Sequence, residues 1–305
     1  MEPRLSRPLV IGVLADVVFD LGGAPPGAPS PALDPPSSGL FESDREGHGP
    51  GRGLPLVRSL LGLNQGEQTT VELVLLSRRD AASSLGVLSS VRSHGLDVLR
   101  AAFTGGEPLS SYLRAFQIDL VLTSSEEDVE DAATVGIAGG LVREAGVRRS
   151  AGELRVALDA DALSLATEPV DPRDRDEVLA SGSSFGALVG MLTRLRAAAD
   201  EAGTPLRIAL LTSRGSADQE RVLLGLQRSG LQLDEAFSLG GLPREGVLDA
   251  FGPQILLGGG SLPADASEKP EFAPVLPVEP LAVADVERDE PSLHSPLSRL
   301  RFRRE

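Results

Sequence analysis

Two aspartates placed two positions apart, Asp159 and Asp161, are the residues of this sequence best suited to covalent phosphate chemistry. They follow the apolar run 155–158, so if that run is a parallel strand, both carboxylates can project toward one ligand. Asp159 could then attack phosphorus and form an aspartyl phosphate. Asp161 could protonate the leaving oxygen and later activate water. A plainer alternative is that both are turn residues at a strand end.

A threonine follows the next apolar run along the chain, 207–211. The hydroxyl of Thr212 and the neighbouring N–H groups, such as that of Ser213, could hold phosphate oxygens. Thr212 could also be the N-cap of the helix expected after it, with no ligand. The first of these interpretations predicts a phosphate site shared by two strand ends.

The elements that must position these residues are short apolar runs that alternate with longer helical patterns, which predicts an α/β fold. The candidate strands are 9–13, 72–76, 120–122, 155–158, 207–211 and 254–257, and the candidate helices are 54–63, 81–94, 109–116, 129–136, 185–202, 217–229 and 244–251. Open α/β sheets bind ligands outside the carboxyl ends of their strands, so these ends are the default sites.

Short segments recur along the chain at a fixed spacing, which indicates an internal duplication. Residues 75–79 resemble 210–214, which lie 135 positions later, and the pair Gly105-Gly106 recurs as Gly240-Gly241 at the same spacing. Upstream, Ala15-Asp16 recurs as Ala160-Asp161 at a spacing of 145. We therefore predict two Rossmann-like α/β units with parallel sheets, in residues 1–150 and 151–260, the second of which carries the aspartate pair.

The composition excludes several classes of protein. The 305 residues include no cysteine and three scattered histidines, which excludes thiol chemistry and disfavours a histidine-based metal site. A formal net charge of −15 argues against nucleic-acid binding. No apolar run reaches the ~18 residues of a membrane span, and the N-terminus has no secretory pattern. We expect a cytoplasmic protein without nucleic-acid or membrane partners, and a homo-oligomer is an open alternative.

The C-terminal segment 261–305 differs from the rest in its many prolines and acidic residues, and it has a basic end at 299–304. This composition is typical of a flexible tail. The alternative is a segment that docks a protein partner. Lys269, the only lysine of the chain, lies in this tail.

The aspartate pair followed by a strand-end threonine resembles the haloacid-dehalogenase-type phosphatases. Within that group, the chain is similar to the cytosolic 5′-nucleotidase family, type I-like, over about residues 7–257. The segments that carry the resemblance are 7–19, 41–45, 71–78, 95–97, 102–106, 112–116, 126–129, 154–162, 210–214, 234–237 and 239–242. The resemblance implies a haloacid-dehalogenase-type fold, Mg²⁺, nucleoside 5′-monophosphates as substrates, Asp159 as nucleophile, Asp161 as acid/base and Thr212 as phosphate ligand.

Two parts of the machinery that the resemblance implies are replaced in this sequence. A lysine is expected soon after the Gly240-Gly241 pair, where Arg244 is the nearest cation and Glu245 could quench it. An aspartate pair that completes the Mg²⁺ shell is expected after the last strand, where the sequence has Gly258 and Gly259. These glycines could form a plain turn or an anion-binding nest. Asp159 and Asp161 alone would hold Mg²⁺ weakly.

The first unit does not supply a complete set of catalytic residues in place of those missing from the second unit. It has Leu14 at the position of the nucleophile, keeps Asp16, and has Ser77 in place of the threonine. The acidic residues 126–128 are expected to open a helix, where negative charge suits the N-terminal dipole, and a Mg²⁺ role for them is the alternative.

Two functions therefore stay open at the level of the sequence. The first is a weakened Mg²⁺-dependent 5′-nucleotidase that hydrolyses nucleoside 5′-monophosphates through an aspartyl phosphate. The second is a catalytically silent homologue that binds a nucleotide, another small phosphate ligand or a protein.

Overall fold

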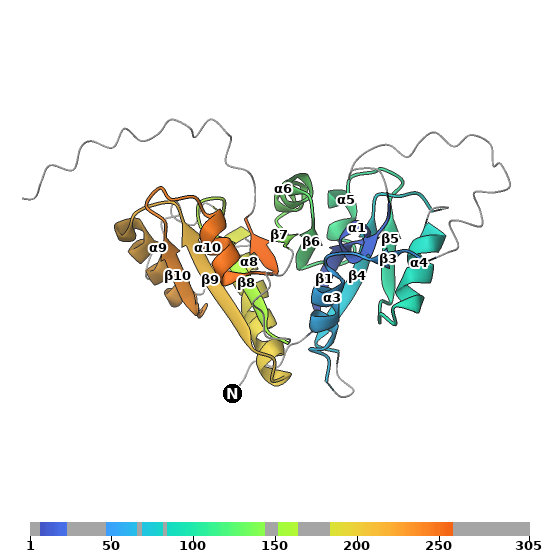
Figure 1. The fold of residues 1–305 in the computed structure, drawn as a ribbon, viewed down its shortest axis with the longest axis horizontal. Helices are drawn as coiled ribbons and strands as arrows, with labels where there is room; N and C mark the ends of the chain where they lie inside the picture. The colour runs from blue at the N-terminus through green and yellow to red at the C-terminus, as the bar shows by residue number, and fades with distance from the viewer. Residues whose placement is uncertain are drawn as a thin grey trace, which may run out of the picture. The chain divides into compact units, whose positions relative to one another are not determined.

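The computed structural model describes residues 7–22, 47–65, 69–81, 84–143, 152–163 and 184–258 of the chain. These residues form an α/β fold built on a nine-stranded sheet in the order β10-β9-β8-β11-β7-β6-β1-β4-β5 (Figure 1). Gly259, Lys269 and the predicted tail at 261–305 lie outside the described residues. What was predicted for them stays a prediction.

The strands of the large sheet are β1 (Leu9–Leu14), β4 (Val71–Ser77), β5 (Arg100–Phe103), β6 (Leu120–Thr123), β7 (Ala138–Val142), β8 (Leu154–Asp159), β9 (Leu206–Thr212), β10 (Glu235–Ser238) and β11 (Ile255–Leu257). A separate antiparallel pair joins β2 (Phe19–Asp20) to β3 (Gly49–Pro50). All six strands predicted from apolar runs are confirmed. Their runs are almost fully buried, as expected for parallel strands with both faces covered.

The large sheet is parallel within each half of the chain and reverses once between them. Strands β5, β4, β1, β6 and β7 run parallel to their neighbours, as do β10, β9, β8 and β11. The junction between β7 and β11 is antiparallel, with Leu256 opposite Leu141. Instead of two separate sheets, the halves form one continuous sheet. The carboxyl ends of the strands in the two halves consequently lie at opposite edges of that sheet.

The helices are α1 (Ala15–Val18), α3 (Leu54–Leu61), α4 (Ser84–Ser93), α5 (Ser110–Leu113), α6 (Glu126–Thr134), α8 (Ser184–Glu201), α9 (Ser216–Arg228) and α10 (Glu245–Phe251). All seven predicted helices are found, although α5 is shorter than predicted. The four-residue helix α1, directly after β1, was not predicted. None of the described helices is long and apolar enough to cross a membrane.

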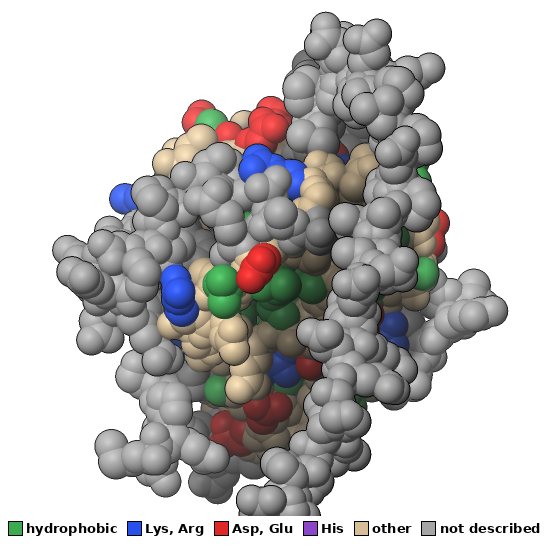
Figure 2. Space-filling model, turned by 90° about the vertical axis from the view of Figure 1, so that its left-hand side faces the viewer, with side chains coloured by type: hydrophobic (Ala, Val, Ile, Leu, Met, Phe, Trp, Pro, Cys, Tyr) green, Lys and Arg blue, Asp and Glu red, His purple; other side chains and the backbone are tan. Residues whose placement is uncertain are grey.

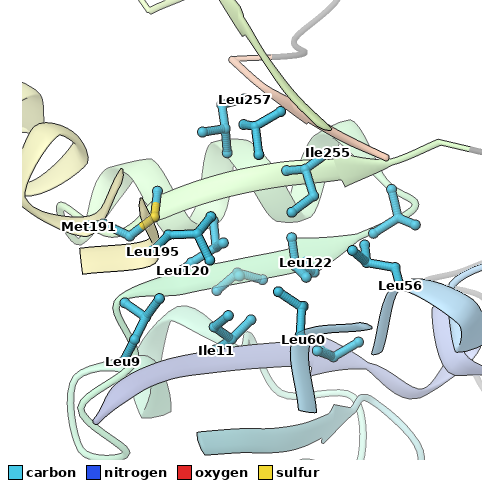
Figure 3. Close-up of a cluster of buried hydrophobic side chains, with 14 of the residues drawn as sticks. Leu9, Ile11, Leu56, Leu60, Leu120, Leu122, Met191, Leu195, Ile255 and Leu257 are labelled. Carbon is cyan, nitrogen blue, oxygen red and sulfur yellow. The ribbon is translucent and has the colours of Figure 1, made fainter. Parts of the chain in front are cut away.

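Helix α8 packs across the two halves. It belongs to the second half of the chain, yet it contacts β1 and β7 as well as β9. Met191 and Leu195 of α8 lie in the same buried cluster as Leu9, Leu120 and Leu257, as Figure 3 shows. The large sheet and α8 therefore bury apolar side chains of both halves in one core.

Candidate functional site

Asp159 is the last residue of β8, a central strand held between β11 and β9. Its side chain is buried, and its Oδ1 atom accepts hydrogen bonds from the backbone N–H groups of Asp161 and Ala162, each at 3.1 Å. These bonds tie the carboxylate to the turn that follows the strand. Its other oxygen, Oδ2, is directed to a different partner.

Arg244 is that partner. It precedes α10, and its Nη1 atom lies 2.5 Å from Oδ2 of Asp159. Glu245, the neighbour that could have quenched this cation, lies 3.8 Å from Arg244 Nε and is 67% exposed. An exposed pair at that distance contributes little. The guanidinium is therefore paired with the predicted nucleophile.

Asp161 faces the end of the neighbouring strand β9. Thr212, the last residue of β9, is buried and donates a hydrogen bond from Oγ1 to Asp161 Oδ1 at 3.1 Å. The backbone N–H of Ser213 donates to Asp161 Oδ2 at 2.5 Å. Arg214 Nε lies 3.4 Å from Asp161 Oδ1, so this second carboxylate also has a guanidinium beside it.

The interpretation of Thr212 as a helix N-cap is wrong. The N-cap of α9 is Gly215, and no side chain caps this helix. The Thr212 hydroxyl contacts Asp161 instead, and it accepts a hydrogen bond at 3.2 Å from the backbone N–H of Arg214. Thr212 is thus a polar side chain turned to the strand-end cluster.

Gly258 follows the third strand end of this site, β11, in a left-handed conformation with φ +82°. A Cβ atom at this position would lie 2.6 Å from Leu163 Cγ and 3.1 Å from the carbonyl oxygen of Asp159. An aspartate would therefore be strained here both by its backbone conformation and by these neighbours. The turn is shaped for glycine rather than for the acid that the resemblance implies.

The second-half site is formed by Asp159, Asp161, Thr212, Ser213, Arg214 and Arg244. Among the described residues, the structure brings together Asp159, Asp161, Thr212, Ser213 and Arg244, all of which the sequence proposed for this site. Arg214 was missed, although it directly follows Ser213 in the strand-end segment and Arg79 occupies the matching position in the first half.

A comparison with protein families decides the relationship that the motifs predicted. The model of the 5′-nucleotidase family matches residues 1–261. The chain belongs to the 5′-nucleotidase family. It is also similar to cytosolic 5′-nucleotidase 1B from Homo sapiens, with 31% identity over 210 residues that cover 62% of this chain. The match spans 34% of the human protein, about a third of its length. No solved structure matches the chain.

The Mg²⁺ ion implied by this 5′-nucleotidase relationship does not fit the residues that the structure describes. Among them, no three acidic or histidine side chains gather where they could hold a metal ion. All four carboxylate oxygens of Asp159 and Asp161 already accept a hydrogen bond from the protein. Mg²⁺ requires near-octahedral oxygen ligation, and a glycine stands where the next carboxylate should be.

The first half of this 5′-nucleotidase-family chain has a different arrangement at its strand ends. Leu14 is buried at the position of the nucleophile, and Asp16 Oδ2 accepts a hydrogen bond from Ser124 Oγ at 2.8 Å. Because the sheet reverses between β7 and β11, Asp16 lies at the edge opposite Asp159 and cannot complete the second-half site.

The acidic residues 126–128 form the first turn of α6, as predicted. One of them, however, is not exposed to solvent. Asp128 is buried, pairs with Arg78, and accepts a hydrogen bond at 2.7 Å from Thr123 Oγ1. Burial raises the pKa of the Asp128 carboxyl, an effect that the Thr123 hydroxyl and the Arg78 guanidinium oppose and that the charges of Asp16 and Asp131 reinforce. The pairing of buried Asp128 with Arg78 was not predicted.

Proposed function

We propose that the second-half site binds nucleoside 5′-monophosphates and hydrolyses them slowly, with Asp159 as nucleophile and Asp161 as acid/base. The observation that carries this proposal is the contact of both aspartates with one strand-end cluster. Family membership supports the phosphatase class, and the name of the human relative supports nucleotides as substrates. The relative's name also supports a cytoplasmic location.

The proposed reaction has two steps. In the first, an oxygen of Asp159 attacks phosphorus, the ester bond from phosphorus to the 5′-oxygen breaks, and Asp161 gives its proton to that oxygen. In the second, Asp161 takes a proton from water, whose oxygen attacks the phosphorus of the aspartyl phosphate; the bond from phosphorus to Asp159 breaks, which restores the carboxylate and releases inorganic phosphate. Thr212 and Ser213 orient Asp161, and Arg244 faces the negative charge that gathers around phosphorus.

The contacts of both aspartates account for a slow reaction. Attack by Asp159 through Oδ2 requires the contact with Arg244 to loosen. Proton transfer by Asp161 requires an oxygen that is engaged with Thr212 or with Ser213. Each of these interactions adds to the barrier before the chemical step, and 1.4 kcal/mol of barrier is about tenfold in rate.

The test is phosphate release from a panel of nucleoside 5′-monophosphates. We expect slow release by the wild-type chain and background release by Asp159→Asn, because the amide is a poor nucleophile. Asp249→Asn is the control: Asp249 is 76% exposed and pairs only loosely with Arg143, at 3.4 Å. Equal release of phosphate by Asp159→Asn and by the wild type would contradict the covalent mechanism.

A second candidate function is a silent homologue that binds the nucleotide without turnover. Two observations favour this function. Arg244 is paired with Asp159, and an acidic residue at position 258 would be strained. Nucleotide binding without any Asp159-dependent phosphate release would establish this second function. Restoring lysine at 244 and aspartates at 258 and 259 is expected to fail unless the turn at Gly258 also rearranges.

We also propose that the two halves arose by duplication, with the boundaries near 1–150 and 151–260. The order β5-β4-β1-β6 in the first half repeats as β10-β9-β8-β11 in the second. Backbone contacts repeat as well, since the N–H of Gly106 donates a hydrogen bond to the carbonyl of Arg78 and the N–H of Gly241 donates one to the carbonyl of Ser213.

We further propose that the tail docks a protein partner. This proposal is tested by a pull-down that compares the full chain with a chain that lacks residues 261–305.

A further inference from the structure

We propose that Arg244 takes the place of the divalent cation in the second-half site, so that the phosphate of a nucleoside monophosphate binds there without Mg²⁺. The identity of the ligand rests on the proposed function. The role of Arg244 rests on the geometry of the site itself.

The first step of the argument is the balance of charge. A phosphate dianion that approaches two unpaired carboxylates is repelled by both, and a divalent cation ordinarily removes that repulsion. Here each carboxylate has its own guanidinium, with Arg244 at 2.5 Å from Asp159 and Arg214 at 3.4 Å from Asp161. The chain's own side chains therefore neutralise the two acids.

The second step is the supply of donors. A guanidinium has five N–H donors in a planar fork that suits phosphate oxygens. Arg244 uses Nη1 for Asp159, and among the described residues its Nη2 atom has no hydrogen bond. Arg214 likewise has both Nη atoms without a hydrogen bond to a described residue, and its side chain is 41% exposed. These donors lie beside the same two carboxylates.

The third step is the lack of room for the cation. The described residues supply two acids, whose oxygens are engaged, and the next strand end has a glycine that a Cβ atom would force against Leu163. Arg244 occupies Oδ2 of Asp159, and the backbone N–H groups of Asp161 and Ala162 occupy Oδ1. A guanidinium there excludes a cation by charge and by volume, while it attracts the anion.

The test is calorimetric titration of the full chain with AMP, in excess Mg²⁺ and in excess EDTA, with adenosine as the ligand that lacks phosphate. We expect AMP to bind equally well in both buffers and adenosine to bind much more weakly. Arg244→Ala is expected to weaken AMP binding by about tenfold or more, because a charge-assisted contact is lost and Asp159 is left unpaired. Arg244→Lys, which keeps the charge, should retain part of the affinity.

Asp159→Asn gives the sharpest distinction between the two cations. If Arg244 serves as the cation, this variant removes a repulsive charge and AMP binds as tightly as before or more tightly. If a divalent ion bridges Asp159 and phosphate, the same variant weakens binding. Arg207→Ala is the matched control: Arg207 belongs to the same strand as Thr212, pairs with Glu235 at 2.6 Å, and lies at the opposite end of the strand.

The proposal is overturned if AMP binding requires Mg²⁺, if Asp159→Asn weakens it, or if the wild-type chain binds no AMP in either buffer. The comparison of the two buffers with wild-type protein needs no variant to fold. Because the readout is binding in EDTA, the result is independent of phosphate release. A chain that binds AMP without Mg²⁺ and never hydrolyses it would support this inference and contradict the proposed reaction.

Discussion

The acidic residues at the strand ends of the two halves are neutralised in different ways. Asp159 has a guanidinium on one oxygen and two backbone N–H groups on the other. Asp128 has Arg78 and the Thr123 hydroxyl, but its burial outweighs both, and the result is a raised pKa. The first carboxylate lies in a cluster of hydrogen-bond donors, and burial makes the second costly to ionise.

The raised pKa of Asp128 predicts a pH dependence of stability. A folded-state pKa above the unfolded value means that the folded chain binds the proton more tightly, so the contribution of Asp128 to stability is full below the ordinary pKa of an aspartate in the unfolded chain and is lost as pH rises through the folded pKa. We therefore expect the free energy of unfolding, measured in urea, to fall with rising pH in the wild type more than in Asp128→Asn. Asp249→Asn, at an exposed position, should show no such difference. Parallel pH profiles for wild type and Asp128→Asn would contradict the expectation.

The turn at Gly258 predicts a second effect of a single residue. Gly258→Ala should lower the free energy of unfolding by about 1–3 kcal/mol, because its φ is +82° and the new Cβ meets Leu163. Gly252→Ala is the control, since Gly252 has a φ of +64° but nothing within 4 Å of an added Cβ. Leu163→Ala should recover part of the loss in a double variant. Equal losses at residues 252 and 258 would mean that the contact with Leu163 does not matter.

At the scale of elements, apolar runs predicted six strands of the large sheet and missed its two edge strands and β7, which lies in the middle. The edge strands β5 and β10 are short and contain Arg100 and Glu235, so neither forms an apolar run. Strand β7 contains Gly139 and Gly140, which lower the strand signal of the sequence. Both glycines are needed by packing: a Cβ atom at Gly140 would lie 2.8 Å from Ile255 Cγ2, across the junction with β11.

The contact of α6 with β7 gives a prediction at this scale. A Cβ atom at Gly139 would lie 2.8 Å from the Cα atom of Val129, and this backbone cannot rotate aside. Gly139→Ala should therefore push α6 from the sheet and cost about 1–3 kcal/mol in denaturant unfolding. Gly190→Ala, inside α8 with nothing within 4 Å of the added Cβ, should instead stabilise by about 0.5–1 kcal/mol. A neutral effect at residue 139 would show that the helix adapts.

At the scale of the whole molecule, the junction of β7 and β11 makes one sheet of two parallel halves. The reversal places the strand-end clusters of the two halves at opposite edges of the sheet. Each cluster is therefore built from residues of its own half. Acidic and basic side chains are interspersed among the described residues on the face in Figure 2.

The shared core predicts that the two halves unfold together. Leu195 of α8 is 1% exposed and lies in the cluster with side chains of the first half. Leu195→Ala should cost about 2–5 kcal/mol while it keeps a single unfolding transition by circular dichroism. Leu224→Ala, at a position that is 41% exposed on α9, should change stability little. Two separate transitions would contradict the shared core.

The sequence by itself determined which residues stand at the strand ends. Apolar runs are local signals, the residue after each run is read directly, and the carboxyl ends of neighbouring parallel strands coincide; Asp159, Asp161 and Thr212 follow from this. The replacements at Arg244 and Gly258 were also visible in the sequence. Only the tertiary structure decided that Arg244 pairs with Asp159, which is 85 positions away, and that the sheet reverses between β7 and β11. Both depend on contacts between segments far apart in the chain, and no local pattern of residues encodes the direction in which two distant strands meet.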